Sequence, residues 1–301
     1  MMHEDPDNTR VLREMPPRHL NWYTRLVVLF GDYTMQAGWF LLAFGSVFFW
    51  STSIRSEAAR WLEQQGTDWQ RQPGVVLKAD SVNVWEKGHH VWKYEYSFAL
   101  AGKEYRGVSY SPEKKFDPQQ IVYIHYDPAN PDINYIIGLR RSPYPAYINL
   151  LLIIPLLGLL IVLLPLRQRL RFLHILRVGD FTRGRLISKS PTGKSIREGS
   201  RVMPQHKYLF QFEHDGVTYT ASCTTHRGYL VEDEEAEIIL YDHFKPQNNI
   251  VYDAVPNVPE IDLAGRMAPP PASKAWTVFL PVFTVTFNLF FFVKSLLDWL
   301  L

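Results

Sequence analysis

Few residues in this chain have the types and spacing that phosphate binding or catalysis requires. Residues 191–195, PTGKS, end like a phosphate-binding loop. That motif needs a first glycine five positions before Gly193, where this chain has Ser188. The motif also opens a helix, and the residues that follow show no helical periodicity. We therefore interpret residues 191–195 as a polar loop.

A metal site has no better support in the sequence. Cys223 is the single cysteine, and it lies near His214 and His226. A Cys/His zinc site needs three or four convergent ligands, so we interpret Cys223 as a small apolar residue of a strand. A single cysteine also excludes an intrachain disulfide. We predict no catalytic residues, no cofactor and no metal site.

A phrase rich in side-chain oxygens occurs twice. Residues 122–135 read VYIHYDPANPDINY, and residues 237–252 read EIILYDHFKPQNNIVY. The first copy resembles a calcium loop in its spacing of oxygens, from Asp127, Asn130, Asp132 and Asn134, but it lacks the glycine and the closing glutamate of such loops. Asp and Asn beside Pro favour turns. We therefore predict a structural turn in both copies, formed by Tyr126, Asp127, Pro128, Asn130, Pro131, Tyr241, Asp242 and Pro246.

The two phrases close a longer repeated pattern of strands. Aromatic residues alternate at positions 94, 96 and 98, and again at 208, 210 and 212, which is the period of a β-strand. Gly102 and Gly216 follow as tight turns, and further strands are predicted over residues 121–126 and 237–241. A repeat of about 110 residues is a duplicated domain. We expect each copy to be a small antiparallel β-barrel or sandwich of about five strands.

Three apolar segments accompany the repeats, at residues 35–54, 145–166 and 276–297. Each is near the roughly twenty residues that a helix needs to cross a bilayer core of about 30 Å. The fold class is therefore a membrane α + β protein with three transmembrane helices and two homologous β-domains. Within these helices, the residues predicted to pack against other helices are Gly38, Gly45 and Asn288.

Arginines set the predicted orientation, because they cluster before the first segment and after the second. If the first and second segments each cross the membrane once, both arginine clusters lie on the same side, which we predict to be the cytoplasm. The alternative is that the second segment, which contains Pro155, enters the membrane and returns to the same side. The stretch 22–30 is either an interfacial helix or an extension of the first span. The predicted order is a cytoplasmic segment 1–34, a transmembrane helix 35–54, an extracytoplasmic β-domain 55–144, a transmembrane helix 145–166, a cytoplasmic β-domain 167–253, a linker 254–275 and a transmembrane helix 276–297.

Composition excludes one further class of function. The chain has 32 Lys and Arg against 30 Asp and Glu, so its net charge is close to zero. Nucleic-acid binding depends mostly on clustered positive charge, and we expect no nucleic-acid partner.

Several of these features together resemble a known family. They are the first apolar segment, Trp61 and Trp69, the Tyr-x-Tyr-x-Phe strand at 94–98, and the phrase Tyr-Asp-Pro-x-Asn-Pro at 126–131. With them, residues 36–166 resemble the bacterial membrane family called domain of unknown function 3592, and residues 170–297 resemble it more weakly. The resemblance implies a multi-pass protein of the bacterial inner membrane and implies no activity.

These observations favour a non-catalytic membrane protein whose β-domains bind partners or assemble with other copies of the chain. Two alternatives remain open at this point. One is an enzyme that modifies lipid or envelope polymer, with His125 and Asp127 as its reactive pair. The other is a channel whose pore forms between copies of the chain.

Overall fold

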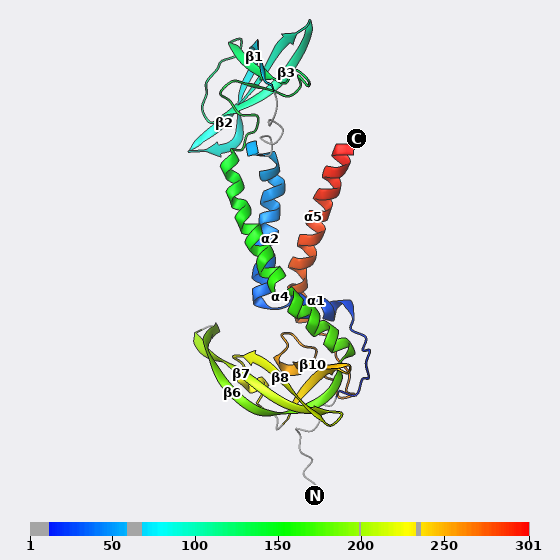
Figure 1. Cartoon of the computed structure of the whole chain (residues 1–301). Coiled ribbons are helices and arrows are strands. Elements are labelled where there is room, and N and C mark those ends of the chain that lie inside the picture. Colours follow the sequence, from blue (N-terminus) through cyan, green and yellow to red (C-terminus); the bar gives the residue numbers. More distant parts are fainter. Residues whose placement is uncertain (1–11, 59–67, 199, 233–235, 301) are drawn as a thin grey trace. The chain divides into compact units, whose positions relative to one another are not determined.

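A computed structural model describes residues 12–58, 68–198, 200–232 and 236–300 (Figure 1). The chain divides into two compact units, each described here by itself. One comprises Leu42–Leu156, and the other comprises Met1–Leu41 with Leu157–Leu301.

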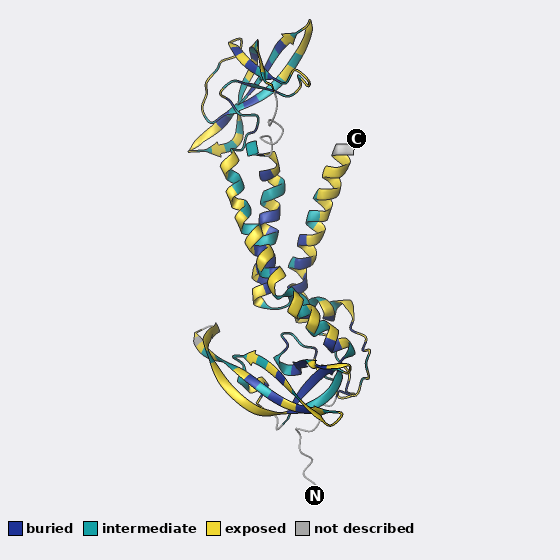
Figure 2. Cartoon of the chain, viewed as in Figure 1, coloured by how far each residue is buried: buried dark blue, intermediate teal, exposed yellow. Residues whose placement is uncertain are grey.

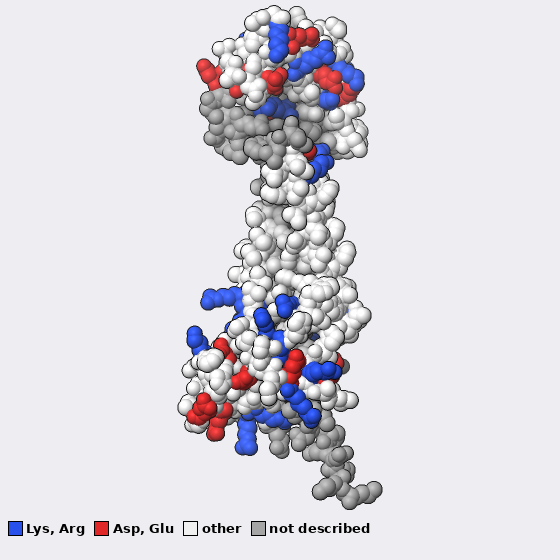
Figure 3. All heavy atoms as spheres, turned by 90° about the vertical axis from the view of Figure 1, so that its right-hand side faces the viewer, with Lys and Arg blue, Asp and Glu red and all other residues white. Residues whose placement is uncertain are grey.

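The chain contains α-helices and short 3-10 helices. The α-helices are α1 (Trp22–Phe30), α2 (Tyr33–Ser51), α4 (Ile153–Val178) and α5 (Trp276–Leu300). Short 3-10 helices are η2 (Ser53–Arg55), η3 (Ala146–Leu152), η4 (Gly228–Leu230), η5 (Tyr252–Ala254) and η6 (Ala272–Lys274). Three helical stretches are long and apolar enough to cross a membrane, namely Tyr33–Arg55, Ala146–Val178 and Trp276–Asp298. In the view of Figure 3 the middle of these helices carries no charged side chain.

Local capping explains why α1 is a helix of its own and not an extension of the first span. The Asn21 side chain accepts a hydrogen bond from the Thr24 amide at 2.7 Å, which satisfies a free donor at the start of α1. The Gly31 amide donates to the Val27 carbonyl at 2.8 Å and ends it. The Asp32 carboxylate then accepts from the Met35 amide at 2.9 Å and opens α2.

The second apolar helix is longer than its apolar segment. We predicted that the second β-domain begins at residue 167, whereas α4 continues to Val178 and the first strand begins at Asp180. Arginine is a good helix former, so the change from apolar to basic residues marks a change of environment and not the end of the helix. Arg18 closes this end, since its guanidinium donates to the carbonyls of Leu176 at 3.2 Å and Gly179 at 2.7 Å.

Glycines allow α2 and α4 to pack closely. A Cβ on Gly38 would lie 2.8 Å from the Ile161 side chain, and a Cβ on Gly45 would lie 2.4 Å from the Pro155 ring. Both distances are below normal van der Waals contact, so a larger residue at either position would force its neighbour on α4 to shift. The two glycines predicted to pack against a helix therefore lie against α4 of the same chain.

The first sheet, called domain 1, has five antiparallel strands in the order β3-β2-β1-β4-β5. They are β1 (Gln70–Glu86), β2 (His89–Leu100), β3 (Lys103–Ser111), β4 (Ile121–Tyr126) and β5 (Asn134–Ile136). The Ile136 amide of β5 donates to the Ser109 hydroxyl of β3 at 2.9 Å, so the first and last strands meet and the sheet curls toward a barrel. Its core lies inside the curl and is built on Tyr94, Tyr96, Phe98 and Ile124.

The second sheet, called domain 2, repeats this arrangement. Its strands are β6 (Asp180–Glu198), β7 (Arg201–His214), β8 (Val217–Thr225), β9 (Glu237–Asp242) and β10 (Lys245–Val251). Their order is β10-β9-β6-β7-β8, which is the order of domain 1 with each strand replaced by its counterpart. Register agrees as well, because Gln70 pairs with Tyr126 as Asp180 pairs with Tyr241. The predicted strands and hairpins of both copies are confirmed at this level.

One sequence interpretation of domain 2 was wrong. Residues 191–195 are not a loop, because they lie within β6 at an irregularity of its pairing with β7. Residues 254–275, predicted as a linker, connect β10 to α5 and also contribute Val255, Val258, Ile261 and Met267 to a hydrophobic cluster. The apolar residues of this stretch are isolated among Pro and Ala, so they showed no periodicity that would reveal their burial.

Domain 2 has two hydrophobic cores, one on each face of its sheet. The inner core contains Tyr208, Phe210, Phe212 and Ile239. The outer core covers β9 and β10, and it joins sheet residues Ile238, Leu240 and Ile250 to helix residues Val28, Ile175 and Leu176 and to Leu12, Leu20, Tyr252 and Val255. Strand β9 is consequently buried on both faces.

Candidate interaction surface

The surface that distinguishes the two domains is the outer face of β1, β4 and β5 in domain 1. Its central row is Arg71, His125 and Tyr135, which pair across the three strands. Side chains alternate between faces along a strand, so Tyr123 lies on the same face as His125. Trp69, just before β1, completes the set. We call Trp69, Arg71, Tyr123, His125 and Tyr135 the outer patch.

Side chains of the outer patch hold one another in place. The Arg71 guanidinium lies 3.6 Å from the centre of the Tyr123 ring, within cation–π range. His125 Nδ1 and the Tyr135 hydroxyl are 3.1 Å apart, at hydrogen-bond distance. The Trp69 ring meets the Tyr135 ring edge-on, with 5.1 Å between centres. The patch is therefore an ordered aromatic surface with a cation on it.

Exposure separates this face from its counterpart. In domain 1, Ile121 is 71% exposed and Tyr123 is 51% exposed. In domain 2, the residue that takes the place of Tyr123 is Ile238, which is 1% exposed. The same face of the same fold is thus uncovered in one copy and covered in the other.

Two ionisable groups in or beside the patch have shifted pKa values. Burial raises the pKa of Glu57 above its ordinary value, although this carboxylate accepts a hydrogen bond from the Arg141 amide at 3.0 Å. Burial likewise raises the pKa of Tyr135, so its hydroxyl stays protonated and able to donate.

The repeated phrase forms the same turn in both domains. The Asp127 carboxylate accepts from the Ala129 amide at 2.9 Å, and the Asp242 carboxylate accepts from the Phe244 amide at 3.0 Å. Asn134 and Asn249 each donate from Nδ2 to a carbonyl three residues back, at 2.8 Å, on Pro131 and Pro246 respectively. Asp and Asn thus bond their own backbone, as turn residues do.

The other residues of the phrase also have structural contacts. Asn130 donates its amide to the Asp127 carbonyl at 3.2 Å, and Pro128 lies within the same turn. The Tyr126 hydroxyl donates to Gln70 at 2.8 Å, whereas the Tyr241 hydroxyl lies 3.0 Å from His214 Nδ1.

Calcium binding at the first turn does not agree with these contacts. Asn134 Oδ1 accepts from the Tyr96 hydroxyl at 2.7 Å while its Nδ2 is bonded to the turn, so the side chain faces the core. Across the described ranges, no group of three His, Cys, Asp or Glu side chains is placed to hold a metal ion.

The His125 and Asp127 pair, considered above for catalysis, is not brought together. His125 bonds to Tyr135, and Asp127 bonds within its turn. In the described part of the chain no hydrogen bond joins the two.

Cys223 lies in β8 and is protected. Burial raises the pKa of its thiol to about 12, which disfavours the reactive thiolate. It pairs in register with Tyr208, while nearby His214 contacts Tyr241 instead.

Domain 2 contains a cluster of ionisable residues that was not predicted from the sequence. His214 and His243 lie with ring centres 5.1 Å apart, and His243 Nδ1 is 2.8 Å from an oxygen of Asp180. The register-equivalent residues of domain 1 are Leu100, Pro128 and Gln70, none of which ionises. Aligning the two copies strand by strand would have found this difference. Each histidine has a protein partner at Nδ1, namely Tyr241 for His214 and Asp180 for His243.

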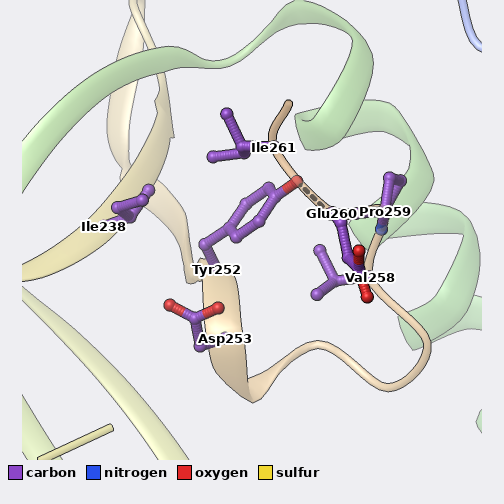
Figure 4. Close-up of a pocket in the computed structure, with 7 residues that line it drawn as sticks. All are labelled: Ile238, Tyr252, Asp253, Val258, Pro259, Glu260 and Ile261. Carbon is purple, nitrogen blue, oxygen red and sulfur yellow. Dashed lines mark hydrogen bonds between the residues drawn. The ribbon is translucent and has the colours of Figure 1, made fainter. Parts of the chain in front are cut away.

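A shallow pocket of about 160 Å³ lies at the edge of the outer core of domain 2 (Figure 4). The Tyr252 ring occupies its middle, between Ile238 and Ile261, and the Tyr252 hydroxyl donates to the Pro259 carbonyl at 2.5 Å. Ligand pockets usually exceed about 300 Å³. This pocket is a packing gap that a small molecule of that class would not fit.

Several polar residues of the helices form contacts within the chain. Asn288 Nδ2 donates to the Thr284 carbonyl of its own helix at 2.8 Å. Gln36 Nε2 joins α2 to α5 by donating to the Thr277 carbonyl at 2.6 Å. Asp32 and Arg169 form an ion pair between α2 and α4.

No known protein family, no curated protein and no solved structure matches this chain. The resemblance to the domain of unknown function 3592 family therefore stays a prediction.

Proposed function

We propose that this protein is an integral membrane scaffold whose β-domains bind other proteins. The observation that carries the proposal is the outer patch, an ordered aromatic and cationic surface that is uncovered in domain 1 and replaced by a buried core in domain 2. Trp, Tyr and Arg are the residues that contribute most to protein interfaces. A scaffold requires such a surface and requires no reaction chemistry.

The lipid bilayer is the first proposed partner. Three long apolar helices support it, and only 33%, 11% and 22% of their apolar windows are buried within the protein, which leaves side chains to face lipid (Figure 2). Arginines of α4, such as Arg167 and Arg177, follow its apolar part directly. By the positive-inside rule we propose a bacterial inner-membrane protein with a cytoplasmic N-terminus, an extracytoplasmic domain 1 and a cytoplasmic domain 2.

Shared topology supports a duplication. The two sheets agree in strand order, register and turn hydrogen bonds, which would be an unusual coincidence for unrelated domains of this size. We propose that they are homologous copies, and that both belong to the family which the sequence resembles.

Orientation can be tested with matched cysteines. Asn134 and Cys223 are poor reporters because they lie in the sheets, with Asn134 only 5% exposed. Glu104 and Thr218 are better, because both are exposed and occupy equivalent positions of β3 and β8. In a Cys223→Ser background, Glu104→Cys should react with an impermeant maleimide in intact cells, and Thr218→Cys should react only after permeabilisation. The reverse pattern would contradict the orientation.

The scaffold function itself is tested by purifying the full chain from native membranes in mild detergent. We expect a stoichiometric protein partner that is lost from the Tyr123→Asp variant and kept by Trp85→Asp, a change at an equally exposed aromatic residue of the β1–β2 hairpin. A pure homo-oligomer or monomer, or substrate turnover that His125→Ala abolishes, would refute the proposal.

A further inference from the structure

We infer that the outer patch of domain 1 receives an amphipathic helix of a partner protein, with a carboxylate of that helix placed opposite Arg71. The inference rests on the proposed scaffold function and adds the kind of partner. It follows from what covers the equivalent face of domain 2, from the residue types of the patch, and from the charge of Arg71.

Domain 2 shows what this face of the fold accepts. The last turns of α4 place Ile175 and Leu176, both fully buried, in one cluster with Ile238 and Leu240 of β9. Three neighbouring strands about 4.8 Å apart present a face roughly 10 Å wide, which matches the diameter of one helix. The face of β6, β9 and β10 is therefore closed from outside the sheet, with the end of α4 and Val28 of α1 supplying the helical side chains and Leu12, Leu20 and Val255 completing the cover.

The residues of domain 1 at the equivalent positions are suited to reversible binding of a partner. Phe181, Ile238, Leu240 and Ile250 of domain 2 correspond to Arg71, Tyr123, His125 and Tyr135 of domain 1. Each of these four has an apolar body and a polar tip, so it tolerates water when the face is open and packs when the face is covered. A permanently covered face would need no such tips, as domain 2 shows.

Arg71 defines the charge of the partner. Its guanidinium is exposed and lies over Tyr123, and no carboxylate pairs with it anywhere in the described ranges. Covering an unpaired guanidinium is costly, and a carboxylate in reach converts that cost into a charge-assisted hydrogen bond. A helix that covers the patch must therefore carry Asp or Glu near its centre.

The first test replaces Tyr123 in the full chain with the photo-crosslinker p-benzoylphenylalanine and irradiates native membranes. The matched control places the same residue at Trp85. We expect one crosslinked protein at position 123 and none at position 85, with the attached peptide mapping to an amphipathic helical segment that contains Asp or Glu.

The second test reverses charges. Arg71→Glu should lower recovery of the crosslinked complex at least tenfold, and changing the acidic residue of the partner helix to Arg should restore it. Arg106→Glu on β3, where the side chain is also exposed, is the matched control and should leave recovery unchanged. If Arg71→Glu impairs folding, as limited proteolysis would show, Arg71→Gln should still lower recovery.

The outcomes separate this inference from the scaffold function. Crosslinks to a strand or a loop of another protein would overturn the helix inference and leave the scaffold function standing. Crosslinks only to a second copy of the chain would overturn the helix inference and count against the scaffold function as well. Crosslinks to lipid alone, or recovery unaffected by Arg71→Glu, would also overturn the helix inference. Absence of any partner both here and in the membrane purification would refute the scaffold function as well.

Discussion

Domain 1 and domain 2 have one strand order and one register, yet they bury different faces. Among the described residues, domain 1 has a single core inside its curled sheet, whereas domain 2 has that core and a second one outside. The difference arises from a few outward positions, such as His125 against Leu240. A fold of this kind can thus keep its interior while its outer face changes from a permanent packing surface to an accessible one.

The interiors differ by a compensating exchange. Tyr96 of β2 pairs with Gly107, and its hydroxyl bonds to Asn134. In domain 2 the equivalent pair is Phe210 and Ala221. The hydroxyl of tyrosine and the methyl group of alanine occupy the same space, so each copy contains one of them.

The largest expected effect contrasts the two outer faces. Ile238→Ala should cost about 2–5 kcal/mol, because it opens a cavity in a closed core. Tyr123→Ala, at the equivalent position, should cost at most about 1 kcal/mol, since it removes mainly the contact with Arg71. Hydrogen exchange of the full chain, resolved by peptide, measures the opening of each domain separately. Equal costs would mean that the outer face of domain 1 is covered by the chain after all.

A second variant probes the exchanged interior pair. Gly107→Ala should destabilise domain 1 by about 1–3 kcal/mol, as overpacking does. The new Cβ would lie 2.4 Å from the Tyr96 hydroxyl oxygen.

Adding Tyr96→Phe should return part of that loss, by making domain 1 resemble domain 2. Asn134 must then turn as Asn249 does, whose Nδ2 also donates to the Thr220 carbonyl at 3.1 Å. A double-mutant cycle measured by the same hydrogen exchange should give a coupling of about 1 kcal/mol or more. If the effects of the two substitutions on stability are simply additive, the proposed exchange between the tyrosine hydroxyl and the alanine methyl group is wrong.

A third comparison uses glycines at matching positions of β1 and β6. A Cβ on Gly74 would lie 2.2 Å from Ile124 Cδ1 and 2.6 Å from the Ser97 carbonyl oxygen. On Gly184 it would lie 2.1 Å from Ile239 Cδ1 but 3.3 Å from the Gln211 carbonyl oxygen. A methyl group can move aside and a backbone carbonyl cannot, so Gly74→Ala should cost about 1 kcal/mol more than Gly184→Ala. Equal shifts in the denaturant midpoints of the two domains would mean that both sheets relax equally and would contradict this prediction.

The smallest effect concerns reactivity and leaves stability unchanged. With the pKa of Cys223 near 12, its thiolate fraction at pH 8 is roughly a thousandfold below that of an ordinary thiol. Native protein should therefore resist iodoacetamide at pH 8 and react once denatured. Ser109→Cys, the matching position in domain 1, should resist equally because Ser109 is fully buried. Rapid alkylation of either thiol would indicate that its sheet opens.

Much of the fold follows from periodicity and turn chemistry. Alternating aromatics predicted β2 and β7, and Asp-Pro or Asn-Pro turns predicted where β4 and β5 meet. The three apolar helices followed from length and hydropathy alone. These features are local, so a single sequence contains the information for them.

The second core of domain 2 could not be predicted in this way. It joins Leu12 and Leu20 to residues such as Ile175 and Val255, which lie far apart in the chain and follow no shared period. The outer patch was missed for a related reason, because Arg71 and Tyr123 become neighbours only once β1 and β4 pair. Of its members, His125 was considered only for catalysis, and Trp69 only as part of the family resemblance.

One residue, Gly179, separates the end of α4 from the start of β6. Because Arg18 clamps this junction and the final turn of α4 is embedded in the outer core, no slack exists between helix and sheet. A rotation of α4 about its axis would therefore rotate domain 2 with it. Adding one residue to α4 just before this junction would rotate the preceding part of α4 by about 100° relative to domain 2, since a helix has 3.6 residues per turn.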